Sequence, residues 1–313
     1  MSAVGRPSRL AESALILATV AEAAIFAAIA PGFFSIANLV NIALSLAVTG
    51  ILAVGMTAVM VTGGIDLGVG SVVALSGVVA AIVAGSGAPL IVAIAAALAV
   101  GVVTGLVNGV LVAWCKVPAF IATLAMLTSA RGLAYIVSGG ESHGDLPASF
   151  GILGRSLVLG IPTPVLVLAG AMLAGAFLLN RTVFGRHIYA IGGNSEASWL
   201  AGIDIRGVLW RVYALNGLLT GLAGMTLASR LGAGVPNSGL QYELDVIAAC
   251  VVGGTSLNGG RGSIGGTLWG TVFIGVLTNG LNLANVDPYL QKIALGVVIV
   301  LAVIGDQVGR RSR

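Results

Sequence analysis

The sequence carries very little charge. Asp, Glu, Lys and Arg make up only 8% of its 313 residues, and 58% of the residues are apolar. A soluble domain has about 25% charged residues, and the mean hydropathy of this chain is +1.07. Because a charge is costly to place in hydrocarbon, the scarcity of charge excludes an ordinary soluble domain and predicts a polytopic membrane protein.

Residues of catalytic and metal chemistry are also scarce. The chain has two histidines and two cysteines, and it contains no HExxH, GxSxG, CxxC or GxxxxGK(S/T) motif. We therefore expect no enzyme activity, no metal site, no nucleotide or other cofactor bound by this chain, and no disulfide. The net charge of +4 does not indicate a nucleic-acid partner, because the basic residues are spread over many short loops.

Ten apolar runs are long enough, or nearly so, to cross a membrane. A spanning helix needs about 20 residues, and continuous apolar runs exclude the alternating strands of a barrel. The prediction is a single all-α transmembrane domain over residues 1–313. Its spans are expected near 13–30, 38–62, 67–84, 90–113, 119–138, 162–180, 208–230, 242–257, 264–284 and 288–305. We expect the first run to be a retained helix rather than a cleaved signal peptide. The short 242–257 run is expected to be a broken or re-entrant helix.

The positions of Lys and Arg orient these spans. With ten crossings and a cytoplasmic N-terminus, most of the 15 basic residues lie inside, as the positive-inside rule expects. Both termini and the segment 184–207 are then cytoplasmic, and the loop 139–161 is outside. Arg131 lies within a span, where it must find a carboxylate, a carbonyl or water, unless the end of that span is misplaced.

The interior contains a weak internal repeat. "VTGGIDLGVGS" (61–71) resembles "VVGGTSLNGGRGS" (251–263), and "GLVNGVL" (105–111) resembles "GVLTNGLNL" (275–283). Transporters are often built from repeats, and the predicted halves are 38–138 and 208–305. The crossing count places both Gly-pair turns on the cytoplasmic side. Candidate hinge or pathway residues in these turns are Gly63, Gly64, Asp66, Gly253 and Gly254.

Several polar residues in these apolar surroundings have two possible roles. Asp66 could be a hinge or pathway residue, but we favour a helix N-cap before "LGVGSVVALSG". Asn108, Asn279 and Asn282 could line a pathway, although buried amides more often hold helices together. Asn216 is open to the same two interpretations.

The cytoplasmic loop 181–207 contains a short polar helix signal, "GNSEASWLAGI". Gly193 and Asn194 indicate a turn and an N-cap, Glu196 suits the first helical turn, and Gly202 can end the helix. Ala197, Leu200 and Ala201 are expected to form a small apolar face. This helix is too short to span, so it could dock into a groove of a partner, lie on lipid headgroups or belong to a folded loop.

Four long motifs identify a family. "TGGIDLGVGS", "VPAFIATLAMLTSARGLAYIVSGG", "FGRHIYAIGGNSEASWLAGI" and "YELDVIAACVVGGTSLNGGRGSIGGTLWG" occur in the order of permease subunits of bacterial ABC importers of the ribose/xylose/galactose type. The chain resembles these permeases over about residues 30–305. It departs modestly from their pattern at Gly68, Ser198 and Asn258, which cautions against assigning a particular sugar.

The resemblance implies a role for the short helix. Gly193, Asn194, Glu196, Ala197, Leu200 and Gly202 would form the coupling element that docks into a cytoplasmic ATPase, which uses the ATP and Mg²⁺. It also implies a second permease copy, an external sugar-binding protein, surrounding lipid, and location in the bacterial inner membrane. Importers of nucleosides, autoinducer-type sugars or branched-chain amino acids are the near alternative. An ion-coupled secondary transporter is the rival class, and it would need carboxylates at the midplane.

Overall fold

The computed structural model describes the chain from residue 9 to residue 311, with side chains described for residues 13–304. It is an all-α bundle in which the ten predicted runs correspond in position to ten helices. They are α1 (Arg9–Ile29), α2 (Ile36–Val61), α3 (Val69–Gly85), α4 (Leu90–Ala113), α5 (Ala119–Ser138), α7 (Thr163–Arg181), α10 (Ile205–Leu231), α11 (Tyr242–Val252), α12 (Ile264–Leu283) and α13 (Pro288–Arg311). Six of them, α2, α4, α5, α7, α10 and α12, are long and apolar enough to cross a membrane.

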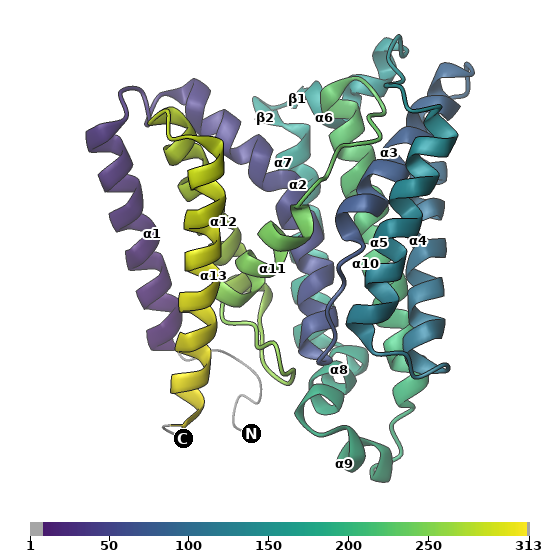
Figure 1. Ribbon diagram of the computed structural model, residues 1–313, viewed down its shortest axis with the longest axis vertical. Helices are drawn as coiled ribbons and strands as arrows, with labels where there is room; N and C mark the ends of the chain where they lie inside the picture. Colours follow the sequence, from purple (N-terminus) through teal and green to yellow (C-terminus); the bar gives the residue numbers. More distant parts are fainter. Residues whose placement is uncertain (1–8, 312–313) are drawn as a thin grey trace.

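Short elements join these helices on the two ends of the bundle. At one end α7 leads into α8 (Val183–Gly193) and α9 (Ser195–Leu200), which precede α10. At the other end the loop after α5 contains the turn η1 (Ala148–Gly151), the helix α6 (Ile152–Arg155), and a hairpin of β1 (Leu157–Val158) and β2 (Ile161–Pro162). The hairpin pairs Leu157 with Pro162 and Val158 with Ile161. Figure 1 shows these two sets of elements at opposite ends of the molecule.

The helices α4 and α10 pack with their backbones in close contact. A Cβ atom on Gly101 would contact the carbonyl oxygen of Gly217, and one on Gly105 would contact the carbonyl oxygen of Tyr213. Gly217 and Gly221 on α10 approach α4 equally closely. Small residues spaced four apart let two helix backbones meet, which is how helices pack tightly in lipid. Glycines, which are abundant in this chain, therefore allow α4 and α10 to pack closely.

One of the ten runs is not a simple spanning helix. The helix expected over 242–257 ends at Val252, and the residues from Gly253 to Ser263 form a loop. Figure 1 shows that α11 is preceded by an extended stretch, so the chain enters this region as a loop and continues as a short helix. The predicted broken helix is thus confirmed, although its helical part is shorter than expected. A second non-helical stretch separates α2 from α3 and includes Asp66.

Candidate coupling site and helix break

The helix α8 was not anticipated as a separate element. Thr182 caps its start, because its hydroxyl oxygen accepts a hydrogen bond from the Gly185 N–H at 3.0 Å. Its buried face consists of Gly185, Ile188 and Ile191, which recur at helical spacing. That spacing is a signal for a helix, although the polar residues around it predict only a loop.

Gly192 in the last turn of α8 packs on two other segments. A Cβ atom there would contact the carbonyl oxygen of Val61 and lie 2.5 Å from the amide nitrogen of Gly260. The Gly260 N–H donates to the Val61 carbonyl at 2.8 Å, and the Tyr189 hydroxyl donates to the Gly262 carbonyl at 2.8 Å. The end of α2, the loop before α12 and α8 therefore form one unit of closely packed backbone.

This packing brings the two Gly-pair turns to the same end of the molecule, as the crossing count predicted. Gly63 has a φ of +86° and Gly254 a φ of +85°, a conformation that glycine adopts without strain. A Cβ atom on Gly64 would lie 2.7 Å from the Tyr213 hydroxyl oxygen, and one on Gly253 would contact the Gly266 carbonyl oxygen. These four glycines therefore serve turns and close approaches.

The helix α9 has the caps that the sequence predicted. The side-chain oxygen of Asn194 accepts a hydrogen bond from the Ala197 N–H at 2.9 Å, Glu196 lies in the first turn, and Gly202 follows the helix with a φ of +80°. The apolar face differs from the prediction, because the helix ends at Leu200 and Ala201 lies beyond it. Trp199, for which no role was predicted, is 66% exposed.

Leu200 is 74% exposed, so α9 presents a large aromatic and a large aliphatic side chain to its surroundings. A cavity of about 670 Å³ lies beside α9. It is lined by Thr62, Ile191, Gly192, Gly193, Asn194, Ser195, Glu196, Ile205, Leu209 and Asn258. The lining comes from the end of α2, from α8 to α10, and from the loop before α12. This end of the molecule can therefore receive a partner both in a hollow and on a protruding apolar helix.

Asp66 is not the N-cap that we favoured. The N-cap of α3 is Gly68, and no side chain caps that helix. Asp66 lies two residues earlier, is buried, and accepts a hydrogen bond from the Gly68 N–H at 2.8 Å with one carboxylate oxygen. Its other oxygen accepts from the side-chain amide of Asn216 on α10 at 2.8 Å. Asn108 on α4 is a further hydrogen-bonding neighbour of the carboxylate.

The other asparagines hold helices together. The amides of Asn38 on α2 and Asn279 on α12 exchange two hydrogen bonds, of 2.9 and 3.0 Å. The side-chain oxygen of Asn282 accepts from the amide of Gln291 at 3.0 Å and joins α12 to the start of α13. Asn279 and Asn282 therefore join helices in this structure, whereas Asn108 belongs to the group around Asp66.

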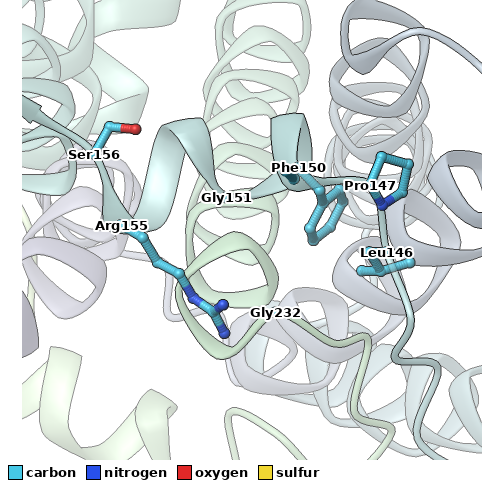
Figure 2. Close-up of a pocket in the computed structure, with 8 residues that line it drawn as sticks. Leu146, Pro147, Phe150, Gly151, Arg155, Ser156 and Gly232 are labelled. Carbon is cyan, nitrogen blue, oxygen red and sulfur yellow. The ribbon is translucent and has the colours of Figure 1, made fainter.

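At the opposite end, arginines bind backbone carbonyls. Arg131 on α5 donates to the carbonyls of Pro236 and Ser238 at 2.7 and 2.8 Å, so it is embedded and satisfied by the loop between α10 and α11. Arg155 donates to the carbonyls of Arg230 and Leu231 at the end of α10. Figure 2 shows this guanidinium reaching toward Gly232 beside a pocket of about 310 Å³. These contacts fix loops, because each satisfies carbonyls that a helix end or irregular backbone leaves free.

The helices and the two ends together define a polytopic membrane protein with a short helix that exposes large apolar side chains at one end. A family model described as "Branched-chain amino acid transport system / permease component" matches residues 38–303. The chain belongs to this family of membrane permeases.

Individual relatives agree with this assignment. The chain is 47% identical over 304 residues to the ribose import permease protein RbsC of Escherichia coli K12, a match that covers 95% of this chain and 94% of that protein. It is 46% identical to RbsC of Bacillus subtilis, with 88% and 87% covered. It is 40% identical to the L-arabinose transport system permease protein AraH of E. coli K12, with 90% and 86% covered. The resemblance found in the motifs is confirmed. No solved structure matches the chain.

Proposed function

We propose that this chain is the membrane-spanning permease subunit of an ATP-binding cassette importer for a ribose-like monosaccharide. The observation that carries the proposal is the 47% identity to the E. coli ribose import permease over nearly the whole of both chains. The arabinose permeases are less similar, at 40%, which favours ribose over arabinose. These sugar permease relatives make nucleosides, autoinducer-type sugars and amino acids less favoured substrates.

The energy for transport comes from a separate cytoplasmic ATPase, which binds and hydrolyses ATP with Mg²⁺. It receives α9 in a surface groove, where Trp199 and Leu200 supply the apolar contact. A short helix with exposed large side chains is the usual occupant of such a groove. Asn194 and Gly202 fix the two ends of that helix, and Gly192 seats α8 on the bundle.

The remaining parts of the proposal concern the assembly. We propose ten membrane crossings, with both termini on the cytoplasmic side together with α8 and α9. Figure 1 supports this, because the start of α1 and the end of α13 lie toward the same end as those helices. Two copies of the chain sit in the bacterial inner membrane, surrounded by lipid, and a binding protein outside delivers the sugar. The predicted repeat halves, 38–138 and 208–305, remain a prediction.

The test is transport by the reconstituted complex. The permease, its ATPase and its binding protein are placed in proteoliposomes, and uptake of labelled D-ribose is measured with L-arabinose as the comparison sugar. We expect uptake that requires ATP and prefers ribose. Uptake driven by an ion gradient without the ATPase would instead show a secondary transporter.

Deletion of Asn194–Gly202 tests the coupling role separately. We expect the shortened chain to be inserted and monodisperse, but to support no ATP-dependent uptake, because the ATPase loses its docking helix. Size-exclusion chromatography of the extracted chain controls for folding. Uptake that survives the deletion would contradict the coupling role and leave the assignment as a permease intact.

A further inference from the structure

A buried polar cluster lies where the chain is interrupted between α2 and α3. Asp66 is 4% exposed and Asn216 is 1% exposed, and their side chains share a 2.8 Å hydrogen bond. The Asp66 carboxylate also accepts the Gly68 N–H at 2.8 Å, immediately before α3 begins. One side chain therefore ties the start of α3 to the middle of α10.

The cluster contains polar atoms with no partner. Among the described side chains, the side-chain oxygens of Asn108 and Asn216 and the hydroxyl of Tyr213 are buried without a hydrogen bond. Tyr213 is fully buried, and Asn108 is 2% exposed. Native proteins satisfy nearly all buried polar atoms, so three orphaned atoms around one carboxylate require an explanation.

Protein backbone lies beside two of these atoms and leaves no room there for a solute. A Cβ atom on Gly55 of α2 would contact the orphaned oxygen of Asn216, and one on Gly64 would lie 2.7 Å from the Tyr213 hydroxyl. A second arrangement of the same helices would give these atoms partners. Discrete alternative packings, rather than gradual deformation, are how bundles change state.

The cluster is connected to the proposed coupling helix by continuous structure. Asp204 caps α10 by accepting the Gly207 N–H, and α9 ends only four residues before it, at Leu200. From there α10 runs through Tyr213 to Asn216. On the other side, α8 packs on Val61, the last residue of α2 before the break. A movement of α8 and α9 therefore reaches both sides of the Asp66–Asn216 bond.

We propose that Asp66 and Asn216 are a positioning pair that links the position of α10 to the break between α2 and α3 during transport. When α10 moves, the orphaned amide oxygens and the Tyr213 hydroxyl exchange partners with the groups that are paired in this arrangement. The proposal rests on the proposed function, because the movement of α10 is the one that the ATPase imposes through α9. Neither residue touches the sugar.

An exchange of the two side chains tests the pair. Asp66→Asn removes the charge and leaves one acceptor oxygen for the two donors that the carboxylate now satisfies, and Asn216→Asp places two carboxylates at hydrogen-bond distance. The double variant restores one amide and one carboxylate, and Asn at position 66 can still accept the Gly68 N–H. The readout is the coupling ratio, the amount of sugar transported per ATP hydrolysed by the reconstituted complex.

We expect each single variant to lower the coupling ratio by about fivefold or more, and the exchange to bring it back within about twofold of the unsubstituted complex. Single effects that simply add in the double variant would overturn the proposal, as would single variants with lower thermal stability and an unchanged ratio. An unsubstituted complex without ATP-dependent uptake would refute the proposed function instead.

Tyr213→Phe covers the case in which the charged variants do not fold. It removes only a hydroxyl that has no partner in this arrangement, so we expect thermal stability to be kept and the coupling ratio to fall. An unchanged ratio would overturn the exchange of partners. The matched control is Asn279→Leu. It removes the amide pair with Asn38, which lies outside the interruption between α2 and α3. It is expected to lower thermal stability and leave the coupling ratio unchanged.

Discussion

The α4–α10 crossing and the α9 helix place opposite demands on their side chains. At the crossing, Gly101 and Gly217 approach so closely that neither can carry even a Cβ atom. On α9, Trp199 and Leu200 extend outward with most of their surface exposed. One region depends on missing side chains and the other on uncovered ones. Substitutions should therefore affect folding at the crossing and partner binding at α9, and the two effects can be measured separately.

Gly217→Ala should have the largest effect on the permease itself. The new methyl group overlaps the Gly101 carbonyl, and overpacking of this kind costs about 1–3 kcal/mol of stability. The matched control is Gly132→Ala on α5, where nothing lies within 4 Å of the added atom. There the better helix propensity of alanine should be neutral or raise stability by up to about 1 kcal/mol. Thermal unfolding of the extracted permease measures both, and equal shifts would contradict the role of the crossing.

Replacing Trp199 and Leu200 together by alanine should have the next largest effect, but only on the assembly. Loss of a buried aromatic anchor typically costs about 2 kcal/mol or more, so binding of the ATPase should weaken about 30-fold. The thermal unfolding temperature of the isolated permease should not fall. The control replaces Leu173 and Phe177 on α7, which are 73% and 65% exposed, and it should leave ATPase binding unchanged. Weaker binding in both variants would mean a general defect.

Gly202→Asp should have a smaller effect, on the orientation of α9. An aspartate at a φ of +80° is strained by about 1–2 kcal/mol, so the end of α9 should shift and ATP-dependent uptake should fall. Gly87→Asp is the control, because Gly87 has a φ of +85° and open space around it but lies between α3 and α4. Both variants should insert with similar stability. Equal loss of uptake in both would argue against a special role for Gly202.

Asn279→Leu should have the smallest effect. It breaks the amide pair with Asn38, and hydrogen bonds between membrane helices are worth about 0.6 kcal/mol on average. Adding Asn38→Leu should cost less than the sum of the two single changes, because the pair is already broken. Thermal unfolding of the three variants measures this. Strict additivity would show that the two amides act independently.

The sequence predicted the six long apolar helices well because each is marked by a long apolar run, which depends on nearby residues alone. The caps of α9 were predictable for the same reason, since Asn194 and Gly202 act within one or two turns. Trp199 was missed because a tryptophan in a mostly apolar chain gives no sign of being exposed. The helix α8 was not predicted because its polar and basic residues are typical of a loop, and only Ile188 and Ile191 show the helical spacing.

The environment of Asp66 could not be predicted in the same way. Its partner, Asn216, lies 150 residues away in the chain, and no local pattern connects the two. A residue before an apolar helix is usually a cap, and that local rule gave the wrong role. Arg131 is a similar case, because its partners are two carbonyls in a loop more than 100 residues later. Long-range polar contacts of this kind become visible only in the folded chain.

The hydrogen bond between Asn216 and Asp66 holds α10 near the middle of its length. The helix has 27 residues, which at 1.5 Å per residue makes it about 40 Å long. Asn216 lies near its midpoint, with about 20 Å of helix on either side. A tilt of about 10° around that point would carry the two ends about 3 Å in opposite directions. Such a tilt would convert a displacement of α10 at its α9 end into an opposite displacement of similar size at its other end.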